Sequence, residues 1–401
     1  MRWCLALSCV WVACAGAAEG PATRGRSARA DQCVGETIET GLDANNDHKL
    51  DDTEVTAATV LCQPTPKAGC TGRVLTGPVE ISSPEDEDKL TNIDCIDGDV
   101  IIVSNDAFDV RGLDGVTITG NLAIAGDPNM ASLDGLAKVK RVGGTLLLQG
   151  NDALADLSAL ASVPAGELAI VANDHLPDLA GLELLSATDL TITRNHELAS
   201  LQGLEQLTSV HRLTIRDNAL TDLAPLHALA SADRVDISDE SRLPNLELPS
   251  LAFAGDVVIE NDGGLASLSL PVLAVAHGTL TLDGDTALGS ATAPSLQQLG
   301  GLEVRGAPQL ATLDVHGVSE AASGITLHQV GLTSLDGLRG LASTGSLAIE
   351  SCDQLASLTA LAELKTVIGD LTITGNAKLK QEDIDSFVKR VHVGGTTKLD
   401  H

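Results

Sequence analysis

The 401-residue sequence has almost no aromatic side chains: three Phe, two Trp and no Tyr. Both Trp lie within the first eleven residues, which leaves Phe108, Phe253 and Phe387 for the rest of the chain. Carbohydrate sites depend on aromatic platforms with an apolar face and a polar tip. The scarcity of such rings argues against a polysaccharide lyase or a glycosidase, the enzymes that a repetitive β-structure would otherwise suggest.

Positive charge is also scarce, because 25 Lys and Arg stand against 55 Asp and Glu, for a net charge of −30 at pH 7. Nucleic-acid backbones are bound by clustered Lys and Arg, and a field of this sign repels them. Nucleic acid is therefore not expected as a partner. The acidity suits the solubility of a long exposed surface better than it suits a specific cationic ligand.

The motifs that carry catalysis are missing as well. The ten histidines are scattered, no HExxH or His-x-x-x-His pair occurs, and no Gly-rich phosphate loop follows a strand. Carboxylate pairs are frequent, but chance alone produces them in so acidic a chain. The sequence therefore predicts no catalytic residues and a protein that is not an enzyme.

The sequence is instead dominated by one repeated phrase: Leu-x-Ile, then an Asn or a substitute, then Leu-x-x-Leu-x-x-Leu. In one copy, Leu168 and Ile170 are followed by Asn173 and by leucines at 176, 179 and 182. The first apolar residue of the phrase recurs thirteen times in steps of 22 to 24 residues, at 100, 122, 146, 168, 190, 213, 235, 257, 280, 302, 325, 347 and 371. Units of this length bury their apolar side only by stacking on their neighbours.

This period predicts a β-rich fold, a capped parallel β-solenoid of about 13 coils that spans residues 98–376. In each strand the side-chain period of two turns Leu168 and Ile170 inward and Ala169 and Val171 outward. Leucines spaced by three share one face of a tight 3₁₀-like turn, which makes the opposite wall of the coil apolar too.

Three residues past the second inward apolar of each strand, the phrase predicts a buried polar ladder. Asn can both donate and accept, so stacked copies satisfy turn groups that are orphaned inside the coil. The predicted members are Asn105, Asp127, Asn151, Asn173, Asn195, Asn218 and Asn376. Cys352 takes the same position and is interpreted as a buried structural thiol rather than a reactive one. In the proline-containing coils of 234–320 the Asn ladder lapses, which we interpret as drift in a tolerant repeat.

The repeat resembles a leucine-rich repeat and, more closely, the receptor L-domain type of β-solenoid. The resemblance covers about three quarters of the chain. It rests on Gly-Asp-Leu-Thr-Ile-Thr-Gly-Asn at 369–376, Asp-Leu-Thr-Ile-Thr-Arg-Asn at 189–195, and Ser-Leu-x-Gly-Leu at 132–136 and 200–204. It implies a right-handed solenoid and extracellular recognition rather than catalysis, although fold analogy alone does not establish function.

Residues 1–18 are typical of a secretory signal peptide, with Arg2, an apolar stretch and then small residues. Two processing outcomes stay open. Cleavage after Ala17 follows an A-x-A site, whereas Val12-Ala13-Cys14 resembles the end of a bacterial lipobox with Cys14 as the lipidated residue, although Trp11 departs from it. The sequence thus predicts an exported protein of the cell envelope, either an outer-membrane lipoprotein or a periplasmic or extracellular protein. Residues 19–31 suit a tether.

Residues 32–64 resemble the small Cys-flanked modules that precede surface domains in bacterial lipoproteins. They contain an EF-hand-like loop, whose positions 1, 3, 5, 7, 9 and 12 supply oxygen ligands to Ca²⁺. These positions hold Asp43, Asn45, Asp47, Lys49, Asp51 and Glu54. His48 replaces the glycine expected at position 6, and no partner loop exists, so a metal-free turn closed by a disulfide is the alternative to Ca²⁺ binding.

Apart from Cys352, the cysteines that follow the leader are at 33, 62, 70 and 95, and export permits disulfides. Pairing nearest neighbours joins Cys33 to Cys62 and Cys70 to Cys95, one of three connectivities. The second bridge would staple an N-terminal cap over residues 65–97. Within 377–401, apolar residues at 384, 387, 388 and 391 have helical spacing and predict a C-terminal capping helix.

The outward strand positions of the first coils are almost all apolar, which predicts a partner-binding patch on the sheet face. Its residues are Ile101, Val103, Ala123, Ala125, Leu147 and Val171. The alternative is that the N-terminal module or a loop of the chain covers them.

Two functions fit this sequence. The first is a non-catalytic recognition protein that binds an unidentified protein of the cell envelope or surface through the solenoid sheet. The second is a structural spacer or coat protein without a specific ligand.

Overall fold

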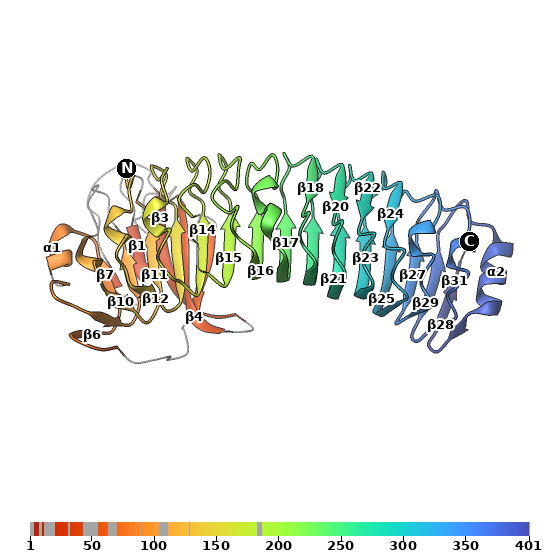
Figure 1. Cartoon of the computed structure of the whole chain (residues 1–401), viewed down its shortest axis with the longest axis horizontal. Helices are drawn as coiled ribbons and strands as arrows, with labels where there is room; N and C mark the ends of the chain where they lie inside the picture. The colour runs from red at the N-terminus through yellow and green to blue at the C-terminus, as the bar shows by residue number, and fades with distance from the viewer. Residues whose placement is uncertain are drawn as a thin grey trace. The chain divides into compact units, whose positions relative to one another are not determined.

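The computed structural model describes residues 4–7, 10–11, 21–30, 33–42, 55–62, 70–88, 90–103, 111–127, 129–182 and 187–400. It divides into two units, residues 1–204 and residues 205–401, and each is described by itself. Both are built of coils whose strands pair in parallel, so that Figure 1 shows the strands of each unit as a row of arrows. The predicted β-solenoid is thereby confirmed.

Unit 1 begins with a five-stranded sheet in the order β2-β1-β3-β4-β5. Its strands are β1 (Cys4–Leu7), β2 (Val10–Trp11), β3 (Pro21–Ala30), β4 (Cys33–Leu42) and β5 (Val55–Cys62). Strand β4 pairs antiparallel with β3 and with β5. Strand β3 occupies the segment that the sequence predicts as a tether, and β1 and β2 fall within the predicted leader.

The coils of unit 1 stack through one main parallel ladder. Its strands are β7 (Val79–Ile81), β9 (Val100–Ile102), β11 (Leu122–Ala125), β13 (Thr145–Gln149), β14 (Glu167–Val171) and β15 (Asp189–Thr193). A shorter ladder runs beside it, through β6 (Val74–Thr76), β8 (Cys95–Asp97), β10 (Thr117–Ile118) and β12 (Arg141–Val142). Because β7 already pairs with β9, part of the predicted N-terminal cap is itself a coil, closed by helix α1 (Pro84–Asp88).

The main ladder of unit 2 is longer. Its strands are β16 (Ser209–Arg216), β17 (Ser231–Ser238), β19 (Phe253–Glu260), β21 (Val275–Asp283), β23 (Gln298–Arg305), β25 (Glu320–His328), β27 (Leu347–Glu350), β29 (Leu371–Thr374) and β31 (Thr397–Leu399). Short strands extend the last coils, namely β26 (Ser343–Thr344), β28 (Thr366–Val367) and β30 (His392–Val393). The ladder thus continues beyond residue 376, where the sequence predicts only a cap.

The strand register builds the core. Leu146 pairs with Leu168 and Leu148 with Ile170, so inward side chains of successive coils stand in columns. These side chains are fully buried, as the alternation of the phrase predicts. Burying one such leucine is worth about 2 kcal/mol. A column of them holds each coil to the next.

The opposite wall has two forms. In six of the described coils 3₁₀ turns form, as the Leu-x-x-Leu spacing predicts. These are η1 (Arg111–Leu113), η2 (Asp134–Leu136), η3 (Ser158–Leu160), η4 (Ala224–Ala228), η5 (Asp336–Leu338) and η6 (Thr359–Leu361). In the proline-containing coils a second parallel sheet replaces them, made of β18 (Asn245–Glu247), β20 (Ser267–Ser269), β22 (Ser290–Thr292) and β24 (Thr312–Asp314). Pro244 and Pro249 flank β18 rather than interrupt it, because proline cannot donate within a ladder.

The predicted C-terminal capping helix is confirmed as α2 (Gln381–Arg390), the blue helix beside the C-terminus in Figure 1. It buries Ile384 and Phe387. The Arg390 guanidinium lies 5.1 Å from the centre of the Phe387 ring, and its Nη1 donates to the carbonyl oxygen of Leu361 at 2.8 Å. The helix is therefore tied both to the apolar core and to a turn of an earlier coil.

Candidate functional site

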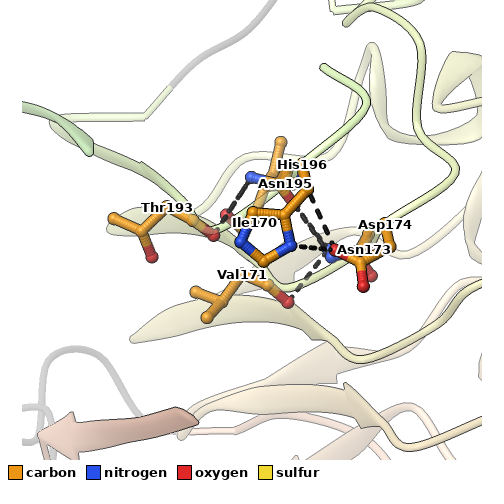
Figure 2. A network of polar contacts seen from close by, with 7 residues as sticks. All are labelled: Ile170, Val171, Asn173, Asp174, Thr193, Asn195 and His196. Atoms are coloured by element: carbon orange, nitrogen blue, oxygen red, sulfur yellow. Dashed lines mark hydrogen bonds and ion pairs between the residues drawn. The ribbon is translucent and has the colours of Figure 1, made fainter. Parts of the chain in front are cut away.

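The predicted polar ladder lies in the turn after each main strand. In unit 1, Asn151, Asn173 and Asn195 are fully buried. The backbone N–H of Asn151 donates to Oδ1 of Asn173 at 3.0 Å, and that of Asn173 donates to Oδ1 of Asn195 at 2.9 Å. Nδ2 of Asn195 donates to the carbonyl oxygens of Ile170 at 3.0 Å and Thr193 at 3.2 Å, as Figure 2 shows. Each side chain thus accepts from one coil and donates to carbonyl groups of two strands.

The residue directly before each of these ladder positions has a left-handed backbone conformation, with a positive φ. Ala172 has a φ of 52° and Arg194 a φ of 58°, in a region that side chains other than Gly, Asn and Asp rarely enter. This bend turns the next side chain into the coil. Outside the same turn, Nδ1 of His196 lies 2.8 Å from Oδ1 of Asp174, an exposed pair that contributes little to stability (Figure 2).

In unit 2 the ladder continues where the sequence predicts that it lapses. Glu240, Asp262 and Asp285 take the ladder position and are completely buried. The backbone N–H of Asn218 donates to Oε1 of Glu240 at 2.9 Å, that of Glu240 to Oδ1 of Asp262 at 2.6 Å, and that of Asp262 to Oδ1 of Asp285 at 2.9 Å. The Asn members are absent from these three coils, as the sequence indicates, but carboxyl groups replace their carboxamides and continue the hydrogen bonding. In the coil after Asp285, Ala307 ends the polar run.

These three carboxyl groups differ in how many of their oxygens have hydrogen-bond partners. Glu240 accepts from both nitrogens of Asn218 and from the N–H of Leu220. In the described part of the chain, by contrast, Oδ2 of Asp262 and Oδ2 of Asp285 are buried without a hydrogen-bond partner. A buried oxygen in this state costs about 1–3 kcal/mol.

Burial also shifts their protonation. It raises the pKa of Asp262 to about 8, with the carboxylates of Asp285, Glu240 and Asp239 acting in the same direction. It raises the pKa of Asp285 to about 7, again with nearby carboxylates, those of Asp283 and Glu260. For Glu240 burial raises the pKa as well, but the hydrogen bonds from Asn218 and Leu220 oppose the rise.

Cys352 and Asn376 resume the ladder toward the C-terminus. The N–H of Cys352 donates to Oδ1 of Asn376 at 2.9 Å, and its Sγ lies 3.6 Å from the carbonyl oxygen of Leu327 and 3.5 Å from that of Glu350. It is a buried free thiol, and burial raises its pKa above the usual value. This placement agrees with a structural thiol, since nucleophilic cysteines have a lowered pKa and some exposure.

The predicted partner-binding patch is not open to solvent. Its residues point outward from the sheet, yet their exposed fractions are only 0–9% for Ile101, Val103, Ala123, Ala125, Leu147 and Val171. All but Ala125 belong, with Ala169, to one buried cluster. The inward core lies on the other side of the sheet, so another part of this chain covers the patch. This agrees with the alternative that a part of the chain covers these residues, whereas their use by a partner stays a prediction.

The sheet face of unit 2 is open and carries paired charges. Nη2 of Arg234 lies 3.0 Å from Oδ2 of Asp236, and its Nη1 lies 3.5 Å from Oδ2 of Asp256 in the next strand. Nδ1 of His328 lies 3.8 Å from Oε2 of Glu350, also one strand on. We call this surface the paired-charge face; its residues are Arg234, Asp236, Asp256, Glu260, Asp283, Glu303, Arg305, His328 and Glu350.

Negative charge is crowded on the paired-charge face. Burial and then the carboxylates of Asp236 and Asp283 raise the pKa of Glu260, while Arg234 and Arg216 lower it. Arg305 pairs with Glu303 within one strand, and both side chains are a little over one-third exposed. The face is thus polar, partly hydrated and fixed in position by the strands beneath it.

Of the remaining predicted sites, the structure describes the disulfide between Cys70 and Cys95 but not the Ca²⁺ loop or Cys14. Cys70 and Cys95 form the predicted disulfide, with their Cα atoms 5.5 Å apart. Cys33 begins β4 and Cys62 ends β5, but their side chains lie outside the described residues, as does Cys14. The predicted Ca²⁺ ligands between residues 43 and 54 also lie outside them.

Among the described residues, no group of three or more His, Cys, Asp or Glu is placed to hold a metal ion. Of the helices found there, none has the length and the apolar composition to cross a membrane.

No protein-family model matches this sequence, and no curated protein matches it. Among solved structures, an internalin (InlF) from Listeria monocytogenes is similar, with 15% identity and a TM-score of 0.35 over 79% of this chain and 83% of that one. The functional domain of InlJ from the same organism, which includes a cysteine ladder, has 16% identity and a TM-score of 0.30 over 73% of this chain and 71% of that one. At these TM-scores the assignment of a solenoid rests on the strand pairing of this chain itself.

Proposed function

We propose that this chain is an exported, non-catalytic repeat protein that binds another protein through the paired-charge face of unit 2. The observation that carries the proposal is that this face is open, whereas the apolar face of unit 1 is covered. A covered face needs a rearrangement before it can bind, and an open one does not.

The strand register supports the proposal. Asp236 pairs with Val258, Thr281 with Glu303, and Thr326 with Ala348, so outward residues form columns across the ladder. Neighbouring strands lie about 4.8 Å apart, which fixes the spacing of these side chains. A rigid array of charges suits a protein partner with the complementary pattern, because electrostatic complementarity gives specificity and speeds association.

One observation favours the second candidate, a spacer or coat protein without a specific ligand. Several charges of the face already pair with each other, such as Arg234 with Asp236 and Asp256. A partner must compete with these internal pairs, whereas a spacer needs no free charge. The exposed pairs contribute only about 0–1 kcal/mol each, so such competition is inexpensive.

The N-terminal features stay part of the proposal. We propose that residues 1–18 direct export, that Cys14 is the lipidation site if a lipid is attached, and that Cys33 pairs with Cys62. We also propose that the loop from Asp43 to Glu54 binds Ca²⁺. The support for each is the spacing of residue types in the sequence. Calorimetric titration of the full chain with Ca²⁺, repeated on Glu54→Gln, tests the metal, because the last loop position supplies the bidentate ligand.

Cross-linking capture from the native cell envelope, with the full chain as bait, tests the binding function. The informative variant is Glu303→Arg with Glu350→Arg, which reverses two charges of the paired-charge face. Its matched control is Glu247→Arg with Glu382→Arg, which makes the same change of charge at exposed positions of β18 and α2. A partner that the control retains and the face variant loses supports recognition. No saturable partner, with calcium or with chelator, supports the spacer.

A further inference from the structure

A ladder Asn makes two kinds of hydrogen bond, and its side chain is the acceptor in only one of them. The oxygen of the side chain accepts the N–H of the preceding ladder residue, as Oδ1 of Asn173 does for Asn151. The other end donates to backbone carbonyls: Nδ2 of Asn151 reaches Ile124, and Nδ2 of Asn376 reaches Ile349.

Cys352 obeys the same rule with different chemistry. Its Sγ lies near the carbonyl oxygens of Leu327 and Glu350, which are the counterparts of the carbonyls that Asn195 meets at Ile170 and Thr193. A thiol is a weak donor, so here too a hydrogen points at the carbonyls. The ladder position therefore calls for a donor on this side.

Asp262 and Asp285 occupy this position without an evident donor. Asp262 is three residues past Ile259, which pairs with Ile237, just as Asn151 is three past Leu148, which pairs with Ile124. By this equivalence Oδ2 of Asp262 faces the carbonyl of Ile237. Asp285, three past Leu282, in the same way faces the carbonyl of Ile259. Both oxygens are among the buried side-chain atoms that have no hydrogen-bond partner among the described residues.

We propose that Asp262 and Asp285 are neutral carboxylic acids in the folded protein, each donating its Oδ2–H to the carbonyl group that a ladder Asn would meet, so that unit 2 is a proton-stabilised array. A carboxylic acid has one accepting oxygen and one O–H donor, which makes it the counterpart of a carboxamide. Ionisation removes the donor and sets a charged oxygen against a carbonyl oxygen. The inference is independent of the proposed binding function.

The charges around the two residues favour the neutral form. The carboxyl group of Asp262 is subject to the charges of Asp285 and Glu240 on the ladder and of Asp239 in the turn of the previous coil. Asp285 meets Asp283 of its own coil and Glu260 of the previous one. All of these are acidic. The cations of this region pair with other carboxylates: Arg216 with Asp239 at 2.9 Å on the exposed side, and Arg305, opposite Asp283 in the next strand, with Glu303.

The raised pKa values of Asp262 and Asp285 determine how the stability of unit 2 changes with pH. Asp has a pKa of about 3.9 in an unfolded chain, whereas that of Asp262 is raised to about 8 and that of Asp285 to about 7. Between these values the folded state binds more protons than the unfolded state, so stability falls as pH rises. The stabilisation is full below about pH 4 and is lost by the time pH passes about 8.

Thermal unfolding of the full chain between pH 5 and pH 9 tests the proposal. The variant is Asp262→Asn with Asp285→Asn, which supplies a permanent donor at both places. The control is Asp353→Asn with Glu363→Gln, which replaces two carboxyl groups by carboxamides at exposed positions. We expect the Tm of the wild type and of the control to fall by roughly 5 °C or more over this range, and the Tm of the ladder variant to stay level and exceed both at pH 9.

Parallel curves for all three proteins overturn the proposal. A rise of the wild-type Tm at pH 9 on adding CaCl₂, absent with choline chloride and absent in the ladder variant, also overturns it, because the site then holds a cation rather than protons. Should the ladder variant not fold, the infrared spectrum of the wild type decides. A protonated-carboxyl band at pH 6 that disappears by pH 9 supports the proposal, and its absence at pH 6 contradicts it.

Discussion

The backbone N–H of Asp262 donates to Oδ1 of Asp285 at 2.9 Å, across two adjacent coils. The same bond joins Asn173 to Asn195 at 2.9 Å in unit 1. A carboxyl group and a carboxamide thus accept the same hydrogen bond in this ladder. They differ only in the second polar atom of the side chain, which is Nδ2 in Asn and Oδ2 in Asp. This difference makes the ladder testable residue by residue.

A carboxyl group introduced at an Asn position of the ladder should make the stability of unit 1 depend on pH, as we propose for Asp262 in unit 2. In Asn173→Asp, the group that donates to the carbonyls of Leu148 and Val171 becomes an acceptor when ionised. We expect unit 1 to lose about 1–3 kcal/mol of unfolding free energy at pH 8, and to recover most of it at pH 4.5. Urea unfolding at both pH values measures this. The exposed change Asn245→Asp is the control, and an equal loss at both pH values would contradict the account.

The thiol of Cys352 should be inert in the folded protein. Burial raises its pKa, so little thiolate is present at pH 8, and the side chain is sealed within the coil. We expect iodoacetamide to modify Cys352 only after unfolding in urea, as followed by peptide mass mapping. Labelling of the native protein at the rate of a free thiol would show that the ladder opens there, against the structural role.

The C-terminal cap should protect the last coils. Phe387 is buried under α2, so Phe387→Ala is expected to cost about 3–5 kcal/mol in the stability of this end of unit 2. Hydrogen exchange should then quicken in β29 and β31 first, because these strands lie at the end that the helix covers. Lys389→Ala, an exposed change on the same helix, is the control. Unchanged exchange in these strands after loss of Phe387 would mean that the helix does not hold the end closed.

The covered apolar face of unit 1 gives a prediction of the opposite kind. Leu147 is completely buried on the outward side of the sheet, so Leu147→Asp should destabilise unit 1 by about 3 kcal/mol or more. Leu147→Met, a change of similar volume, should cost less than about 1.5 kcal/mol. Urea unfolding compares the two. If the aspartate variant unfolds like the wild type, the face is open in solution and regains its place as a candidate docking site.

The repeat was predictable because two periods coincide in this sequence, the alternation within a strand and the recurrence of the coil. The two periods place Leu168 and Ile170 inward. Thirteen such pairs can be buried together only if the coils stack. The spacing of Ile384 and Phe387 likewise predicted α2. The acidic continuation of the ladder was not predicted, although Asp127 was among the predicted members and the same offset from Ile259 leads directly to Asp262.

The open or covered state of the outward face could not be predicted from the sequence. Outward apolar residues such as Ile101 and Leu147 have the same pattern whether they meet a partner or another part of the chain. Only the three-dimensional contacts distinguish these cases, and they show the face of unit 1 buried. The second sheet on the back of unit 2 was not predicted either, because prolines such as Pro244 and Pro249 indicated a break in the pattern without indicating what replaces the turns.

The most direct test of the binding function is an isotherm for a captured envelope protein with the full chain, measured at two salt concentrations. We expect saturable binding that weakens with salt and is lost in Glu303→Arg with Glu350→Arg, but is retained in Glu247→Arg with Glu382→Arg. Equal affinity of the two charge-reversed variants, or binding that never saturates, would contradict the assignment of the paired-charge face and favour the spacer.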